Sequence, residues 1–216
     1  MSDVPNSSFP YPALREAERP KGGHLYRVFS LTNHAPMKLF HREQLLAWTM
    51  LEFDPTVVSF EAINRWFDHV SGAIYVGYYV RYMEYDCFMY IPNPAGIESL
   101  KSFEKYAKSF NVKLSPMLSE KTPQNDTLFW NRMSMLSVLV SERDKLSSRN
   151  LTQFSRSIEN YEVTVGELEQ MPDYVGQEAL AYAFELVRKG HFAISGLKDE
   201  LLQKSSVLRI AKSVKR

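Results

Sequence analysis

Apolar residues recur at helical spacing in four long stretches of the chain, separated by runs of β-branched and aromatic residues. The predicted helices cover residues 37–53, 97–110, 127–145 and 177–188. Pro55 ends the first of these helices, and Gly190 closes the last. A further short helix is predicted after Thr164, because Glu167 three residues later completes a capping box. The pattern predicts a mixed α/β protein.

The strands are predicted from β-branched and aromatic runs bounded by Gly and Pro. They cover residues 25–31, 56–63 and 112–118, together with a long β-rich stretch at 66–91. Six tyrosines between residues 75 and 90 are more typical of sheet packing than of a base-stacking platform. Two short segments, residues 191–194 and 207–210, are predicted to pair as the strands of a wing.

The predicted elements divide the chain into three regions. Residues 1–23, rich in Pro, Ser and Gly, are expected to form an irregular N-terminal arm. Residues 24–122 contain helix, strands, helix and strand, an αβββαβ order shared by many metal-dependent nucleases and by folds that cut nothing. Residues 123–216 are mostly helical and are expected to form a C-terminal domain that includes a winged helix and ends in a basic tail.

Composition narrows the classes of protein. A chain of 216 residues with 44% hydrophobic residues can build a packed core, while a net charge of +1 argues neither for nor against nucleic acid. The single cysteine, Cys87, excludes an intramolecular disulfide and a cysteine zinc cluster. No apolar stretch approaches the roughly 18 residues of a membrane span, and no signal-peptide core is visible. We therefore expect a cytoplasmic protein without a membrane partner.

One motif is distinctive. The segment "LEFDPTVVSFE", residues 51–61, resembles the "LEFDP.V.SFE" signature of the TnsA family, the endonuclease subunit of heteromeric transposases. With weaker motifs, the similarity extends over about residues 37–210, including "FEKYAKSFNVKLSPMLSE" at 103–120. The resemblance implies a restriction-endonuclease-like core followed by a helical, winged-helix C-terminal domain.

The resemblance also implies a metal site. Nucleases of this kind hold Mg²⁺ or Mn²⁺ between carboxylates and use a lysine to orient the attacking water. The helix ligand of the family falls on Gln44, with Glu43 one residue away, and the strand ligand falls on Asp86 or Glu84. Lys101 comes nearest to the spacing of the family's lysine, so Glu43, Asp86 and Lys101 are the candidate catalytic residues, and Glu43 and Asp86 the candidate metal ligands. The amide at position 44 and the missing "VEVK" strand favour loss of cleavage.

Candidate DNA-binding residues lie in the winged-helix region and the tail. From residue 201 to residue 216 there are five basic residues and no acidic one. The full candidate set is Gln177, Arg188, Lys189, Lys204, Arg209, Lys212, Lys215 and Arg216.

Three functional hypotheses follow. In the first, the chain is a catalytically impaired TnsA-like component of a DNA transposition system that binds transposon ends and a transposase subunit, with an ATPase regulator as a further candidate partner. In the second, it is an active endonuclease that uses Mg²⁺ or Mn²⁺ to cleave the 5′ transposon ends. In the third, it is a DNA-binding regulator unrelated to transposition.

Overall fold

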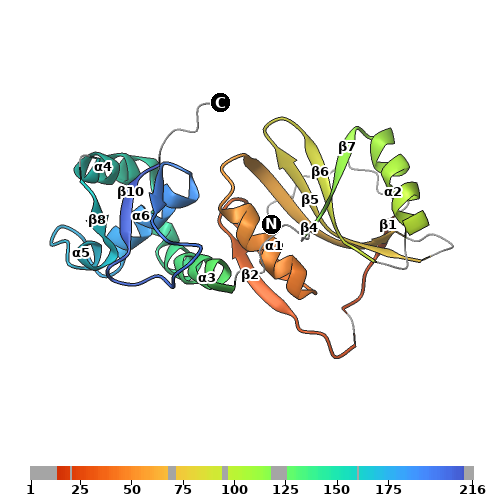
Figure 1. Ribbon diagram of the computed structural model, residues 1–216, viewed down its shortest axis with the longest axis horizontal. Helices are drawn as coiled ribbons and strands as arrows, with labels where there is room; N and C mark the ends of the chain where they lie inside the picture. Colours follow the sequence, from red (N-terminus) through yellow and green to blue (C-terminus); the bar gives the residue numbers. More distant parts are fainter. Residues whose placement is uncertain are drawn as a thin grey trace, which may run out of the picture.

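The computed structural model describes residues 14–19, 21–67, 72–93, 97–117, 126–159 and 161–211. The chain forms two lobes that lie side by side (Figure 1). We call residues 14–117 the sheet lobe and residues 126–211 the helical lobe. The protein is mixed α/β with a mixed central sheet, in agreement with the coarse prediction from the sequence.

A five-stranded sheet forms the centre of the sheet lobe, in the order β1-β4-β5-β6-β7. Its strands are β1 (Leu14–Glu16), β4 (Val57–Phe67), β5 (Ile74–Tyr82), β6 (Asp86–Ile91) and β7 (Val112–Pro116). Each neighbouring pair from β1 to β6 is antiparallel, whereas β7 runs parallel to β6. Helix α2 (Ile97–Ser109) supplies the crossover that a parallel pair requires.

A hairpin precedes the first helix. It consists of β2 (Tyr26–Ser30) and β3 (Ala35–Leu39), and helix α1 (Arg42–Glu52) follows it. The prediction of a helix from residue 37 was therefore wrong at its start, because Met37 pairs with Val28 across the hairpin. Met37 and Leu39 lie two positions apart, which is the period of a strand and not of a helix.

The N-terminal arm is not irregular throughout, contrary to the prediction. Strand β1 pairs with β4, with Leu14 opposite Phe67, and both Leu14 and Ala17 are buried. A strand of three residues is too short to leave a periodic pattern in the sequence. Residues 1–13 of the predicted arm lie outside the described part of the chain.

Different helices cover the two faces of the sheet (Figure 1). Helix α1 packs through Trp48 on the face that presents Met89. Helix α2 packs through Phe103 on the opposite face, which presents Phe88. Because side chains alternate along a strand, Asp86 lies on the same face as Phe88, two residues further along β6.

The helical lobe begins with α3 (Asp126–Ser141) and a short 3-10 helix, η1 (Arg143–Lys145). Its remaining elements, in chain order, are α4 (Ser148–Ile158), β8 (Val163–Thr164), α5 (Val165–Glu169), α6 (Glu178–Arg188), β9 (Phe192–Ile194) and β10 (Val207–Ile210). The three strands pair antiparallel in the order β8-β10-β9. The predicted capping box of α5 is present, since Thr164 and Glu167 bond each other's backbone N–H groups.

Helix α4 was not predicted. It begins just after the predicted helix 127–145, where the Ser147 side chain accepts a hydrogen bond from the backbone N–H of Asn150 at 3.2 Å. The buried residues of α4, Leu151, Phe154 and Ile158, recur at i, i+3 and i+7, so the sequence did contain the helical spacing.

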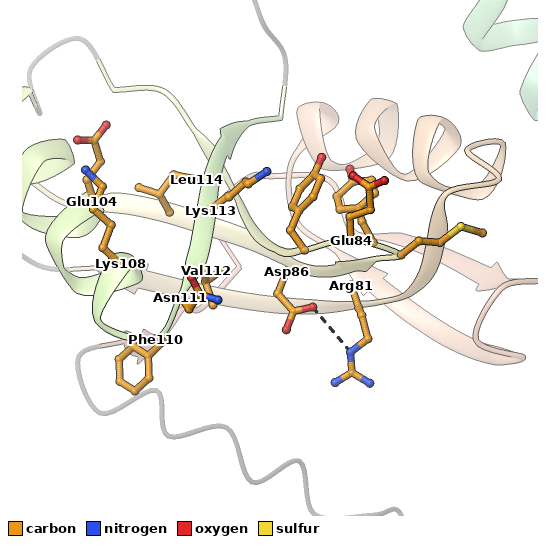
Figure 2. A pocket seen from close by; sticks show the side chains of 13 residues that line it. Arg81, Glu84, Asp86, Glu104, Lys108, Phe110, Asn111, Val112, Lys113 and Leu114 are labelled. Carbon is orange, nitrogen blue, oxygen red and sulfur yellow. Dashed lines mark ion pairs between the residues drawn. The ribbon is translucent and has the colours of Figure 1, made fainter. Parts of the chain in front are cut away.

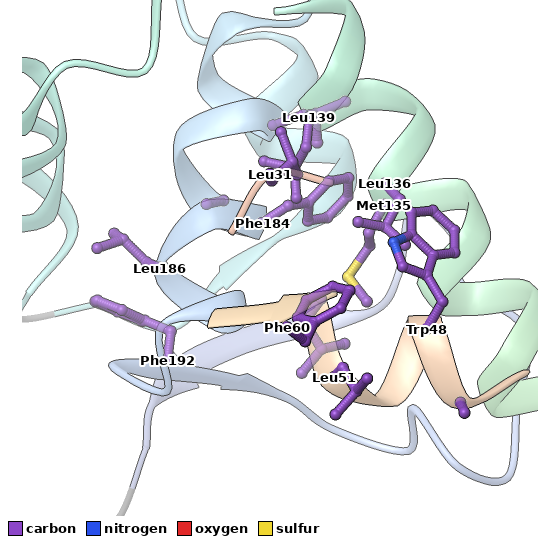
Figure 3. Close-up of a cluster of buried hydrophobic side chains, with 14 of the residues drawn as sticks. Leu31, Trp48, Leu51, Phe60, Met135, Leu136, Leu139, Phe184, Leu186 and Phe192 are labelled. Carbon is purple, nitrogen blue, oxygen red and sulfur yellow. The ribbon is translucent and has the colours of Figure 1, made fainter. Parts of the chain in front are cut away.

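The two lobes share one hydrophobic core. Trp48 and Phe60 of the sheet lobe belong to the same buried cluster as Leu136, Leu139 and Phe184 of the helical lobe (Figure 3). Burial of apolar surface between the lobes therefore stabilises both of them together. No helix in the described residues is long and apolar enough to cross a membrane.

Candidate functional site

The position where the resemblance places a metal ligand is occupied by a fully buried amide. Gln44 lies on the face of α1 that packs against the sheet, with 0% of its surface exposed. Its Nε2 donates to Asn64 Oδ1 at 2.8 Å and to the Gly77 carbonyl oxygen at 3.2 Å. Its Oε1 accepts from the Phe40 backbone N–H at 2.9 Å and lies 3.0 Å from the Tyr75 hydroxyl, whose single proton also has Asn64 Oδ1 within reach at 2.7 Å. Both donor sites of the amide and its oxygen are therefore engaged by neighbouring groups.

The partners of Gln44 are held by two irregularities in the sheet. Asn64 has a φ of 45° and lies in a bulge of β4, a left-handed conformation that Asn tolerates better than most residues. The pairing of β5 with β6 shifts between Val76 and Tyr78, which places Gly77 opposite α1. A Cβ on Gly77 would lie 2.0 Å from Met117 Cε, so there is no room at position 77 for a carboxylate side chain. Gln44 and Met117 therefore fill the space between α1 and β5.

The amide cluster of Gln44, Asn64, Tyr75 and Tyr78 contains no charged side chain. The Tyr78 hydroxyl donates to the backbone carbonyl oxygen of Gln44 at 3.0 Å. Burial raises the pKa of both tyrosines, so they remain protonated donors at neutral pH. A hard divalent cation binds carboxylate and carbonyl oxygens that are free to face it, and here the amide and hydroxyl groups are committed to one another.

His41 borders this cluster. Its ring packs against Tyr75 with centroids 4.2 Å apart, and its Nε2 atom is buried without a hydrogen-bond partner in the described residues. Burial lowers the pKa of His41 although Glu43 acts in the opposite direction, so the imidazole is neutral at pH 7. One neutral imidazole beside amides does not amount to a set of metal ligands, and no group of three or more His, Cys, Asp or Glu suited to a metal occurs among the residues that the structure describes.

The structure does not bring the candidate catalytic residues together. Glu43 lies on α1, next to Gln44. Asp86 projects from the opposite face of the sheet, where it accepts a hydrogen bond from the Tyr79 hydroxyl and lies 3.8 Å from Arg81 Nε (Figure 2). Lys101 is exposed on α2. One metal ion cannot contact Glu43 and Asp86 across the sheet.

An open hollow of about 930 Å³ borders Asp86 (Figure 2). It includes Glu84, the alternative strand ligand, which is exposed in the turn between β5 and β6. Lys113 and Tyr85 also line the hollow, and the Nζ of Lys113 lies 3.7 Å from the centre of the Tyr85 ring. Exposed Phe110 closes another part of the rim. Exposed aromatic side chains are enriched at protein contact surfaces, where polar and charged groups form the rim.

Sequence reasoning missed the role of Glu52. Its side chain is fully buried and accepts hydrogen bonds from Trp48 Nε1 at 3.1 Å and from the backbone N–H and hydroxyl of Thr32 at 3.1 and 3.0 Å. Arg188 Nη1 of the helical lobe lies 3.6 Å from Glu52 Oε2. The spacing of Gln44, Trp48 and Glu52, four residues apart on α1, was the available signal that all three share the buried face.

Arg188, one of the candidate DNA-binding residues, connects the two lobes. Its side chain is only 13% exposed and forms a two-bond fork with Glu185, at 2.7 and 2.8 Å. The same guanidinium donates to the Thr32 hydroxyl at 3.0 Å. We call Glu52, Glu185 and Arg188 the interlobe triad.

The interlobe triad predicts a pH dependence. Burial raises the pKa of Glu52 above its ordinary value of 4.5, and the Thr32 and Arg188 contacts offset this only in part. In the pH range between the ordinary and the raised pKa, the folded protein binds more protons at this group than the unfolded chain does. The contribution of Glu52 to stability therefore falls as pH rises through that range and is constant above it.

Replacing Glu52 by Gln removes this dependence of stability on pH. We expect the difference in free energy of unfolding, wild type minus Glu52→Gln, to decrease from pH 4 upward and then level off, as measured by urea denaturation. Glu43→Gln, on the same helix, is the matched control. A difference that increases with pH would show that Arg188 outweighs burial at Glu52.

The remaining candidate DNA-binding residues are mostly engaged. Lys189 lies 3.5 Å from Glu185, Lys204 lies 2.8 Å from Glu169, and Arg209 hydrogen-bonds to Ser195. Gln177 is exposed at the start of α6. Lys212, Lys215 and Arg216 lie outside the described residues.

Comparison with known proteins identifies no family for this chain. No family model matches the sequence, and no curated protein matches it.

Proposed function

We propose that this chain is a TnsA-like component of a DNA transposition system that does not cut DNA and serves as a DNA- and transposase-binding subunit. The sequence resemblance at residues 51–61 motivates the family. The order α1-β4-β5-β6-α2-β7, with a parallel β6-β7 pair, is compatible with a restriction-endonuclease-like core. The order α4-β8-α5-α6-β9-β10, with the sheet order β8-β10-β9, is compatible with a winged helix.

The observation that carries the loss of cleavage is the buried amide of Gln44. A metal-dependent nuclease needs two or three carboxylates around one cation. Here the helix position is neutral and both the nitrogen and the oxygen of its amide are hydrogen-bonded within the protein, while Asp86 projects from the other face of the sheet. The side chains at these positions are suited to stabilising the fold and not to holding a metal ion for hydrolysis.

The hollow beside Asp86 supports the transposase-binding part of the proposal. Met83 is 61% exposed at its rim, and Tyr85 and Phe110 are each 37% exposed. Methionine and aromatic side chains are enriched at protein interfaces because they bury much apolar area at low entropic cost.

Mn²⁺ titration followed by calorimetry, in the presence of a short DNA duplex, tests the loss of cleavage. We expect no saturable binding heat from the wild-type protein and no change in Glu43→Ala or Asp86→Ala. Glu104→Ala is the control, since Glu104 is an exposed carboxylate that borders the same hollow. Saturable binding that both Glu43→Ala and Asp86→Ala abolish would instead establish a metal site and favour an active endonuclease that cleaves 5′ transposon ends.

A further inference from the structure

Helix α6 holds the place of a recognition helix in the proposed winged helix, but its surface is occupied. Residues 179–186 are all buried. The helix packs against α3, α4 and α5, and its last residue, Arg188, belongs to the interlobe triad. An element enclosed in this way cannot enter a DNA groove, so DNA must meet the helical lobe elsewhere.

The basic residues of the helical lobe indicate where DNA would bind. Its described part contains ten basic residues. Eight of them contact a carboxylate, a hydroxyl, an aromatic ring or another group of the protein. Within residues 126–159 and 161–211, Arg149 and Arg156 are the two without such a partner, and both are exposed. A cation without an internal partner keeps its full charge available for an anionic ligand.

Both arginines lie on the exposed face of α4. They are seven residues, or two turns, apart, which places them about 10 Å from each other along the helix axis. Ser148 and Thr152 lie on the same face and border, with Arg156, two adjoining hollows of about 490 and 560 Å³. Arginine guanidinium groups and serine and threonine hydroxyls are the side-chain donors that proteins direct at phosphate oxygens.

One further cation lies beside this face. Lys189, which also pairs with Glu185, borders the hollow of about 490 Å³ from the end of α6, and the lining of the two hollows includes one carboxylate, Glu159. Neighbouring phosphates on one DNA strand advance by about 3.4 Å along the helix axis, so a separation of about 10 Å spans roughly three base-pair steps. Two contacts at this spacing suit a duplex backbone that runs along α4.

We propose that the exposed face of α4, with Arg149 and Arg156 as its charged contacts, binds the phosphate backbone of double-stranded DNA. The inference rests on the proposed DNA-binding function and specifies the surface that performs it. It assigns phosphate contacts to two residues of α4 that the candidate set drawn from the sequence did not contain. Because the contacts are to phosphate, this surface positions the protein on DNA without selecting a base sequence.

The test is fluorescence anisotropy with a labelled duplex of about 30 base pairs at 50–200 mM KCl. For Arg149→Gln/Arg156→Gln we expect roughly tenfold weaker binding at 100 mM salt and a slope of log affinity against log salt smaller by about 2. Arg27→Gln/Lys38→Gln, two exposed cations opposite each other in the β2-β3 hairpin, is the matched control and should leave both quantities unchanged. Thermal melts of both variants verify that the fold is intact.

The outcomes separate this inference from the function on which it rests. Duplex binding by the wild type that the α4 variant leaves unchanged overturns the α4 surface but not DNA binding. Absence of duplex binding by the wild type at 50 mM salt overturns both. A larger loss of affinity for single-stranded RNA than for duplex DNA assigns the surface to RNA and overturns the proposal.

Discussion

Replacing Arg188 by Met is expected to lower the free energy of unfolding by about 3–5 kcal/mol. Arg188 is the cation that balances two buried carboxylates, Glu52 at 0% and Glu185 at 5% side-chain exposure. Removing it leaves both negative charges in the interface between the lobes, where water cannot solvate them. Urea denaturation at pH 7, monitored by tryptophan fluorescence, measures the change.

Two variants make this result specific. Lys189→Met removes a 43% exposed cation that pairs with the same Glu185, and should cost no more than about 1 kcal/mol. Adding Glu52→Gln and Glu185→Gln to Arg188→Met removes every charge of the interlobe triad and should recover most of the lost stability. If Arg188→Met is no more destabilising than Lys189→Met, the triad is not the electrostatic link that its geometry indicates.

Gln44→Glu is expected to destabilise the protein by about 2–4 kcal/mol at pH 7. The amide Nε2 donates to two oxygens, of Asn64 and Gly77, and a carboxylate in its place would present an acceptor to both. Adding 10 mM Mg²⁺ or Mn²⁺ should not restore the loss, because a ligand stabilises a protein only where the folded state binds it.

Glu43→Gln, the inverse substitution at the neighbouring position of α1, is the control for Gln44→Glu. It should change the free energy of unfolding by less than about 0.5 kcal/mol, because Glu43 is only half-buried and no hydrogen bond to its side chain is found in the described residues. A rise in melting temperature of Gln44→Glu on addition of Mg²⁺, absent in wild type, would show that one carboxylate recreates a cation site and would contradict the structural role of the amide cluster.

The motif that carries the family resemblance lies at the junction of the lobes. Leu51 is buried in the shared core, and Glu52 belongs to the interlobe triad. Asp54 Oδ1 accepts from the backbone N–H and the hydroxyl of Thr56, at 2.9 and 2.6 Å, and so shapes the turn into β4. These contacts account for the residue types of the motif, and none of the contacts involves a metal ion.

Gly190 completes the junction on the side of the helical lobe. Its φ is 73°, a left-handed conformation suited to glycine, and a Cβ at this position would lie 3.2 Å from Pro55 Cγ. The closing glycine of α6, expected from the sequence as a helix end, therefore also permits close approach of the two lobes.

Local chemistry accounts for the elements that the sequence predicted correctly. The bounds of α2 and α6 follow from their apolar periodicity, and the capping box at Thr164 depends on residues three positions apart. The pairing of β9 with β10 follows from short apolar segments that frame a polar loop. Such features need no information from distant parts of the chain.

The arrangement of the candidate metal site depends on strand register and on contacts between distant segments of the chain. Whether Asp86 faces α1 or α2 is set by strand register, and a shift of one residue reverses the face. The bulge at Gly77, the partners of Gln44 and the absence of space beside Met117 arise from segments 20 to 73 residues apart in the chain. No sequence pattern near position 44 contains these relations.

The sequence by itself determined the α/β class, most of the helices and strands, and the neutral side chain at position 44. Only the tertiary structure decided which side chains meet: it separated Glu43 from Asp86, enclosed Arg188 between two carboxylates, and left Arg149 and Arg156 without partners in the described residues. The physical reason is that helix periodicity and capping act over a few residues, whereas burial and charge pairing depend on segments as far apart as Glu52 and Arg188.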